Sequence, residues 1–376
     1  MQTILKIVRW IVGLLFIFSG LIKANDPLGL SYKMQEFFEV WHMPAFNDYT
    51  LALSLLMIAF EIIAGVALLV GWRMKLVSWL LLILIIFFTF LTGYALFSGR
   101  IKTCGCFGDC IPLTAQTSFI KDLALLLLIL FLFLNKDKIR PAASSTTSVQ
   151  ILIVTVILSF GFQWYVLKHL PVLDCLPYKK GVNIAEGRKI PANAIPDSTV
   201  ISFVYEKQGQ EVEFTADQFP EDFNDSLYQF VRRYDKVVRK GNAEPPIKDF
   251  VLYTLDGTDS TDEILSAPGP ACFLFVKDEW NDQSFRSSLA AVYQSARAKQ
   301  IPFYLVTNNR ELATAITIGP EKNRPDKSLL CDGVAIKTAA RANPTLYLLK
   351  DGTIVGKWGY ADFMRAREKG LDEISK

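Results

Sequence analysis

Residues 76–97, LVSWLLLILIIFFTFLTGYALF, carry no charged side chain. A helix needs about 20 consecutive apolar residues to cross a bilayer, so this stretch predicts a membrane-spanning helix. Four more stretches are similar: 51–70 with one charge, 149–167 with none, 4–22 with Lys6 and Arg9 near its start, and 118–134. The last of these spans only if Lys121 and Asp122 lie at the interface. The pattern predicts a multi-pass protein of the lipid bilayer.

The composition of the whole chain agrees with this prediction. Of its 376 residues, 51% are hydrophobic and 20% are charged, and the mean hydropathy is +0.27. This is too apolar for a soluble enzyme of this size and excludes a disordered chain. The 40 basic and 37 acidic side chains leave a net charge of +3, without the concentrated basic field that nucleic-acid binding requires.

Histidine is scarce, since His42 and His169 are the two in the sequence. They leave little material for a histidine metal centre or a Ser-His-Asp triad. Any chemistry must therefore use cysteines or carboxylates.

The first apolar stretch, residues 4–22, has two interpretations. A basic start before an apolar run is also the pattern of a cleaved signal peptide. No small-x-small cleavage site follows, because the chain continues Ser19-Gly20-Leu21-Ile22-Lys23. We therefore interpret the stretch as a span, with its early basic residues at the headgroups.

Short loops predict the orientation of the spans. With a cytoplasmic N-terminus, seven basic residues lie inside and five outside; the inside set is Lys6, Arg9, Arg73, Lys75, Lys136, Lys138 and Arg140, and the outside set is Lys23, Lys33, Arg100, Lys102 and Lys121. This is a positive-inside bias, and the inside loops are the shorter ones. Five spans then place the C-terminal half outside the cytoplasm, on the periplasmic face of the cell (inner, cytoplasmic) membrane.

Three cysteines form a cluster in the loop after residues 76–97: Cys104-Gly105-Cys106-Phe107-Gly108-Asp109-Cys110. On the predicted topology this loop faces an oxidising compartment, where thiols and disulfides can cycle. The two glycines allow a tight turn, so we expect two of the three sulfurs to meet and the third to attack or shuttle. Cys104, Cys106 and Cys110 are the candidate redox residues.

Two other interpretations of this cluster stay open. One is a static disulfide that braces the loop. The other is a metal site, for which three thiolates would need Asp109 or a water as the fourth ligand, so we expect no metal. The spacing C-x-C-x3-C also differs from the usual C-x-x-C of redox motifs.

Glu61 is a second candidate, because it lies near the middle of an otherwise apolar span. An intramembrane carboxylate is costly and is usually protonated or paired. Lys23 is a candidate partner, although we expect it nearer the interface. The side chain then serves either proton handling or an interhelical hydrogen bond.

Three motifs in the membrane half resemble a known family. They are FSGLIK at 18–23, EIIAG at 61–65 followed by LLVG at 68–71, and CGCFGD at 104–109. Together they resemble the DoxX-like superfamily, and the cysteine segment is most similar to its methylamine utilisation branch, MauE, over roughly residues 1–135. The resemblance implies a four-helix membrane bundle that assists disulfide formation or electron transfer during maturation of a periplasmic protein.

The rest of the chain departs from a stand-alone MauE. Residues 136–170 are predicted as a cytoplasmic loop and a fifth transmembrane helix, and residues 171–245 as a small α+β extracytoplasmic connector. In the connector, 199–205 and 211–214 flank a glycine-containing turn and predict a hairpin. Residues 222–238 have apolar positions at the spacing of an amphipathic helix.

Residues 246–376 have the element order of an α/β thioredoxin-like domain. A buried strand at 271–276, a helix at 285–298 and a strand at 303–307 precede a proline-led hairpin at 345–349 and 353–358 and a last helix from about 361. Asn343-Pro344-Thr345-Leu346 resembles the cis-proline loop of that superfamily. The resemblance implies that Pro344 and Thr345 receive a partner polypeptide.

The C-x-x-C of such domains is missing, because the positions after the first strand read Lys277-Asp278-Glu279-Trp280-Asn281. Cys272 falls inside the strand and is expected to be a small buried hydrophobe. Cys331 is expected to be a core or bystander residue rather than a catalytic one. The domain is therefore predicted to bind or position something.

Two hypotheses for function follow. The first is a membrane thiol–disulfide or electron-transfer component that serves an extracytoplasmic client, with quinone as the acceptor by analogy with other membrane disulfide-forming proteins; no cofactor is evident in the sequence itself. The second is a non-catalytic assembly or anchoring protein whose thioredoxin-like domain is a binding module. A small-solute transporter is a distant third, since there is no internal repeat.

Overall fold

The computed structural model describes residues 1–101, 105–224, 226–239, 241–278, 285–316, 318 and 325–374. Within this part of the chain, five helices are long and apolar enough to cross a membrane, which confirms the predicted multi-pass character. They are α1 (Gln2–Asn25), α3 (Thr50–Val70, preceded by the 3-10 turn η1, Pro44–Tyr49), α4 (Met74–Ser98), α5 (Ala115–Leu134) and α6 (Ser145–His169). A short turn, η2 (Lys136–Lys138), joins α5 to the segment before α6.

The bundle has an apolar inside and an apolar outside. Val12, Leu68, Leu81 and Ile129 lie in its core, whereas large apolar side chains such as Leu127 point outward. This distribution is typical of helices that pack together in lipid.

Small residues set the spacing of α1 and α3. A Cβ atom on Gly65 would lie 2.8 Å from the Gly13 carbonyl oxygen, so the two backbones approach closely here. Close approach through small residues is a common device of membrane helix pairs. It brings the later turns of α1 against the middle of α3, so that Lys23 on α1 meets Glu61 on α3.

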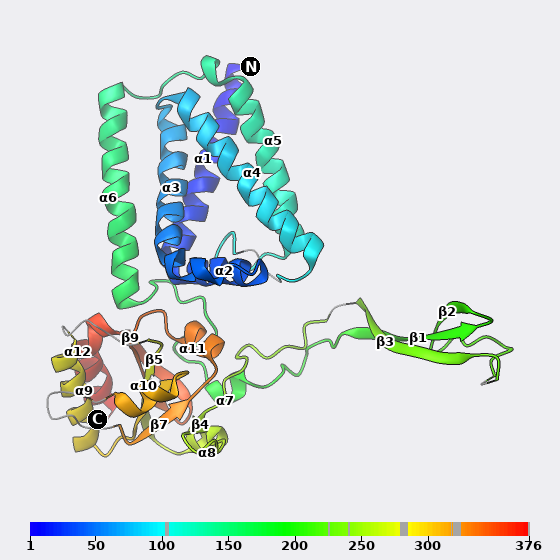
Figure 1. Ribbon diagram of the computed structural model, residues 1–376. Coiled ribbons are helices and arrows are strands. Elements are labelled where there is room, and N and C mark those ends of the chain that lie inside the picture. The colour runs from blue at the N-terminus through cyan, green and yellow to red at the C-terminus, as the bar shows by residue number, and fades with distance from the viewer. Residues whose placement is uncertain are drawn as a thin grey trace.

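A sixth helix, α2 (Pro27–Val40), lies across one end of the bundle (Figure 1). Asp26 ends α1 and caps α2, because its side chain accepts a hydrogen bond from Gly29 N, and Pro27 occupies the first helical position. This helix was not among the predicted elements.

The C-terminal region is a six-stranded mixed sheet with the strand order β4-β7-β6-β5-β8-β9. Its strands are β4 (Tyr253–Thr254), β5 (Pro270–Val276), β6 (Phe303–Thr307), β7 (Lys327–Leu330), β8 (Thr345–Lys350) and β9 (Thr353–Gly359). Strands β5, β6 and β7 are parallel, and β4, β8 and β9 pair antiparallel to their neighbours. The strands predicted at 271–276, 303–307, 345–349 and 353–358 are confirmed.

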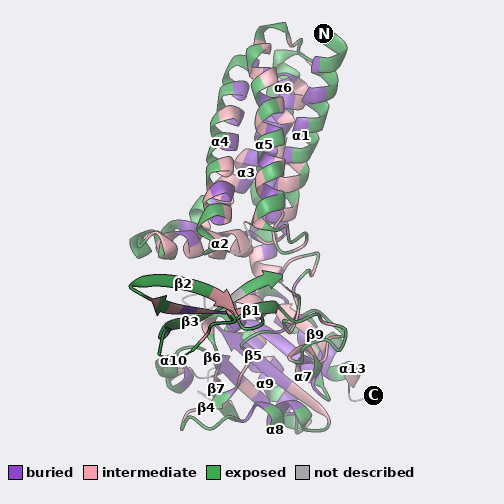
Figure 2. Cartoon of the chain, turned by 90° about the vertical axis from the view of Figure 1, so that its right-hand side faces the viewer, coloured by how far each residue is buried: buried purple, intermediate pink, exposed green. Residues whose placement is uncertain are grey.

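Helices cover both faces of this sheet. They are α7 (Ile184–Gly187), α8 (Thr261–Ser266), α9 (Arg286–Ala298), α10 (Arg310–Ala315), α11 (Gly333–Ala339), η3 (Tyr360–Asp362), α12 (Phe363–Ala366), η4 (Arg367–Leu371) and α13 (Asp372–Ile374). Alternate residues of β5 serve two cores, Phe273 and Phe275 on one face and Cys272 and Leu274 on the other. Figure 2 shows the buried positions concentrated on these central strands.

A three-stranded antiparallel arm projects away from both regions (Figure 1). It consists of β1 (Ser198–Lys207), β2 (Gln210–Thr215) and β3 (Gln229–Arg239), in the order β2-β1-β3. The predicted hairpin is confirmed. The helix predicted at 222–238 is wrong, because residues 229–239 pair with β1 as a strand. Their β-branched and aromatic residues suit a pleated surface, and the pairing outweighs the helical spacing.

Candidate functional site

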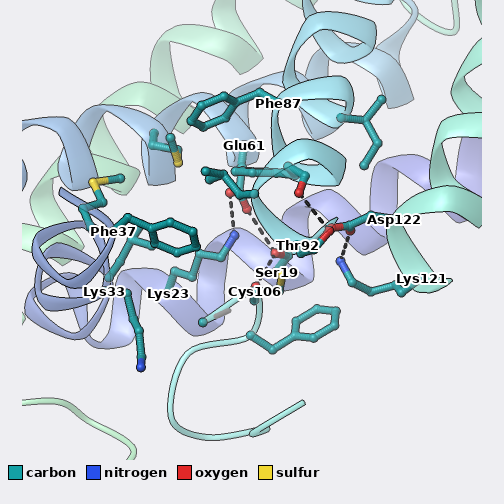
Figure 3. A pocket seen from close by; sticks show the side chains of 18 of the residues that line it. Ser19, Lys23, Lys33, Phe37, Glu61, Phe87, Thr92, Cys106, Lys121 and Asp122 are labelled. Carbon is teal, nitrogen blue, oxygen red and sulfur yellow. Dashed lines mark hydrogen bonds and ion pairs between the residues drawn. The ribbon is translucent and has the colours of Figure 1, made fainter. Parts of the chain in front are cut away.

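A cavity of about 230 Å³ lies inside the bundle at the end covered by α2. Its walls are mostly apolar or aromatic and include Phe37, Trp41 and Phe88. One side is polar, and Figure 3 shows the side chains gathered there. This cavity is the candidate site.

Lys23 and Glu61 form the first polar group of the cavity. Lys23 Nζ lies 2.5 Å from Glu61 Oε1, and both side chains are buried. Ser19 Oγ lies 3.0 Å from Glu61 Oε2 and 3.1 Å from the Cys106 carbonyl oxygen, so its single proton can go to either acceptor. The suggestion from the sequence that Lys23 is a partner of Glu61 is confirmed.

Lys121 and Asp122 form a second polar group on α5. Lys121 Nζ lies 2.5 Å from Asp122 Oδ1, and Thr92 Oγ1 donates a hydrogen bond of 3.1 Å to Asp122 Oδ2. Asp122 is fully buried, so its carboxylate faces the bundle interior. Asp122 was not among the predicted site residues, although an acidic residue within a span was the available signal.

Cys106 is a free thiol among the described residues and lines the same cavity. Its loop turns sharply, since Gly105 and Gly108 both have positive φ and Gly108 N donates to Gly105 O. Burial raises the pKa of the Cys106 thiol, and the positive charge of Lys121 acts in the opposite direction. The thiol therefore lies close to both ion pairs of the cavity, Lys23–Glu61 and Lys121–Asp122.

Cys110 forms a disulfide with Cys175, which lies after α6. The expectation that two sulfurs within the three-cysteine cluster meet is wrong for Cys110, whose partner Cys175 was not among the predicted residues. Cys104 lies outside the described residues. Cys175 lies on the same predicted side of the membrane as the cluster, which was a usable signal for a disulfide. A pairing across 65 residues, however, depends on the tertiary fold.

Pro344 follows a cis peptide bond, as the resemblance to a cis-proline loop implied. The Asn343 side chain closes this loop on the segment after β5, since it accepts from Lys277 N and donates to the Asp278 carbonyl. Glu279 to Asn281 lie outside the described residues. Pro344 and Thr345 are buried, and Thr345 Oγ1 donates to the Ala342 carbonyl within the loop.

The proline loop end of the domain contacts the membrane bundle. Arg341 Nε lies 2.8 Å from Asp26 Oδ2, and Arg341 Nη2 lies 2.7 Å from Asp109 Oδ2 in the cysteine loop. Lys277 Nζ donates to the Tyr32 hydroxyl on α2 at 2.9 Å. The proline-loop end of this domain therefore lies against α2 and the cysteine loop of the same chain.

The remaining two cysteines lie in separate cores of the C-terminal sheet. Cys272 is fully buried in β5, as expected of a small hydrophobe, and Cys331 is buried on the other face. Burial raises the pKa of each thiol to about 12. Across the described ranges, no three side chains of His, Cys, Asp or Glu gather to hold a metal ion.

One family model matches the first part of the membrane region. The family model of methylamine utilisation protein MauE matches residues 1–135. This confirms the resemblance of the three motifs, and the MauE-like part contains α1 to α5, the cavity and the cysteine loop. A second model, a domain of unknown function (DUF8463), matches residues 199–240, which is the projecting arm. No curated protein and no solved structure matches the chain.

Proposed function

We propose that this chain is an integral membrane thiol–disulfide component that passes electrons from thiols on the extracytoplasmic side to an acceptor inside the membrane bundle, and so supports maturation of an extracytoplasmic client. The observation that carries this proposal is one loop with two sulfur sites of opposite surroundings. Cys106 lines the cavity of the bundle, whereas Cys110 is bonded to the exposed Cys175 four positions further along the loop.

The outer disulfide is the group that a client dithiol would reach. Its Cys175 side is exposed, so a client thiolate can attack and form a mixed disulfide. A second client thiol then resolves it, which leaves an oxidised client and reduced Cys110 and Cys175. In the orientation predicted from the basic residues of the loops, the N-terminus lies in the cytoplasm. Both sulfur sites then lie at the periplasmic face, where disulfides persist.

The inner site passes the electrons on. We assign this step to the Cys106 thiol and a second thiol of the loop, for which the sequence offers Cys104. A disulfide between these two inner cysteines first takes the electrons of reduced Cys110 and Cys175 by thiol–disulfide exchange, which closes Cys110–Cys175 again and leaves two inner thiols. When the inner thiols close again they release two electrons and two protons, which a quinone bound in the cavity would take up to become a quinol. The apolar walls suit a lipid-soluble ring, and the Lys23, Ser19 and Lys121 side chains supply donors for its oxygens.

The first experiment is a redox titration of the loop cysteines and Cys175 in native membranes, by differential alkylation and mass spectrometry. Catalytic dithiols titrate between about −120 and −270 mV, and structural disulfides stay closed below about −300 mV. A couple in the first range supports the proposal. Bonds that stay closed would move the assignment to the second function below.

The second experiment measures quinol formation by the full-length protein in nanodiscs with a dithiol donor. We expect Cys106→Ser to bring the rate near background, with Cys272→Ala as a control that removes a thiol far from the loop. We expect Met57→Trp, which fills the cavity, to slow the reaction, whereas Leu56→Trp on the lipid-facing side leaves it unchanged. Equal rates in the Met57 and Leu56 variants would contradict the assigned acceptor site.

A second candidate function is assembly or anchoring without redox turnover. Two observations favour it: the sequence lacks C-x-x-C after β5, and Pro344 is buried beside a contact with the bundle. In this case Cys110–Cys175 is a permanent brace, and the thioredoxin-like domain is a binding module for the membrane half and a client.

A further inference from the structure

The residue before each cysteine of the disulfide is an aspartate, and each aspartate pairs with a cation of the C-terminal domain. Asp109 precedes Cys110, and its Oδ2 lies 2.7 Å from Arg341 Nη2. Asp174 precedes Cys175, and its Oδ2 lies 2.6 Å from Lys357 Nζ. Both ends of the bond are therefore attached to the same domain by ion pairs.

Arg341 is the more enclosed of the two cations. Its side chain is 6% exposed, and besides Asp109 it binds Asp26 and donates to the Lys337 carbonyl at 2.5 Å. Burial favours the neutral guanidine, but Asp26 and Asp109 together hold the pKa of Arg341 above its ordinary value. The guanidinium thus joins the α1–α2 junction and the cysteine loop to the start of the proline loop.

Lys357 lies on β9 beside the antiparallel partner strand β8. Its side chain is 12% exposed, and Nζ also donates to the Tyr178 carbonyl at 3.3 Å. Leu173, which precedes Asp174 in the chain, is attached to the bundle instead. Its N–H donates to the Asn25 side chain at the end of α1, and its carbonyl accepts from that side chain. The segment that carries Cys175 is therefore held between the bundle and the sheet.

We propose that Arg341 and Lys357 are positioning residues that couple docking of the C-terminal domain to the redox state of Cys110–Cys175. By holding Asp109 and Asp174, they keep the two cysteine segments close even when the bond is open, so the thiols close again readily. Coupling of two equilibria is reciprocal, so the closed bond also favours the docked domain. The inference rests on the proposed function only where it takes this bond to be exchanged in the cell.

The test is the reduction equilibrium of Cys110–Cys175 in the full-length protein in nanodiscs, in graded dithiothreitol buffers. Dithiothreitol gives two electrons and two protons, the sulfur–sulfur bond opens to two thiols, and the reagent closes to its cyclic disulfide. We expect Arg341→Met and Lys357→Met each to make reduction up to about tenfold more favourable, which is about 30 mV for a two-electron couple. Arg188→Met, which removes an ion pair with Asp262 in the same domain, is the matched control.

Asp174→Asn keeps the test decisive where a cation variant folds poorly, because it removes the second ion pair without a change in the sheet. It should shift the equilibrium in the same direction as Lys357→Met, and the double variant should add little to either single one. An ion pair that serves stability alone would lower the unfolding midpoint and leave the reduction equilibrium at the wild-type value. That result would overturn the proposal.

The reciprocal effect is measured by amide hydrogen exchange. Reduction of the wild type should speed exchange around Arg341 and around Tyr32 on α2, and reduction should have a smaller effect in Arg341→Met. Unchanged exchange on reduction would also overturn the coupling. A wild-type bond that stays closed below about −300 mV, with the variant shifts present, would contradict the proposed redox function and leave the coupling intact.

Discussion

At the scale of single residues, the chemistry of the bundle depends on paired charges in an apolar surrounding. Lys23 and Glu61 are buried on facing helices, and the Ser19 hydroxyl donates a hydrogen bond to the carboxylate. Removal of one partner leaves an uncompensated charge where water cannot reach it, whereas removal of both leaves none. This difference separates an ion pair from two independent side chains.

We expect Lys23→Met to destabilise the bundle by about 3–5 kcal/mol. Lys23→Met combined with Glu61→Gln should recover much of that loss, because no charge remains unpaired. Thermal unfolding in detergent measures both, with Lys33→Met as the control: Lys33 pairs with Glu36 in a partly exposed position, so its loss should cost at most about 1 kcal/mol. A double variant as unstable as the single one would show that the pair is not the cause.

At the scale of elements, the arm is stabilised by its own aromatic cluster. The Phe214 ring contacts Tyr205 at 5.3 Å between centroids and Phe219 at 4.8 Å, and Phe223 and Tyr228 lie in the same cluster. A small sheet that projects from the rest of the chain has few other apolar contacts, so these rings supply most of its packing.

We expect Phe214→Ala to destabilise the arm by roughly 2–4 kcal/mol and to leave the six-stranded sheet unchanged. Amide hydrogen exchange should rise across β1 to β3 and stay the same in β5, β6 and β8. Val238→Ala is the control, since Val238 lies near the C-terminal end of β3 and its side chain is 63% exposed. Faster exchange in β5 as well would mean that the arm and the sheet unfold together.

At the scale of the whole molecule, the contact between the C-terminal domain and α2 contains a lysine with an unusual titration. Burial lowers the pKa of Lys277 to about 7, and Arg341 adds to that effect. Burial also raises the pKa of Tyr32, so the hydroxyl that faces Lys277 stays neutral. The charged groups around Lys277 are Arg341, Asp278, Asp26 and Lys337.

The contact should tighten as pH rises. A free lysine side chain keeps its proton to about pH 10.4, whereas docked Lys277 loses it above about pH 7, so undocking takes up a proton between these values. The free energy of docking therefore becomes more favourable by at most about 1.4 kcal/mol for each pH unit above pH 7. Below pH 7 it no longer changes with pH.

An interdomain distance measured by fluorescence transfer from pH 6 to 9.5 checks this expectation. Lys277→Met should remove the slope, and Lys369→Met, on an exposed turn, should keep it. The same slope in both variants would assign the pH dependence to another group.

Much of the architecture follows from local patterns. The five spans, the hairpin of β1 and β2, strands β5, β6, β8 and β9, and helix α9 coincide with predicted segments, because apolar length, alternation and turn residues act over a few positions. The MauE resemblance rests on short motifs of the same kind. Strand β3 was mistaken for a helix, since its strand character depends on pairing with β1.

The sequence by itself determined which residues have unusual chemistry, and the tertiary structure decided their partners. Glu61, Cys106 and Pro344 stand out in the sequence because of their type and spacing. The pairing of Cys110 with Cys175 and of Arg341 with Asp109 became visible only in three dimensions, and the tertiary structure also confirmed Lys23, a candidate in the sequence, as the partner of Glu61. The physical reason is range: local propensity acts between neighbours in the chain, whereas ion pairs and disulfides need groups that only the packing of helices, loops and sheet brings within a few ångströms.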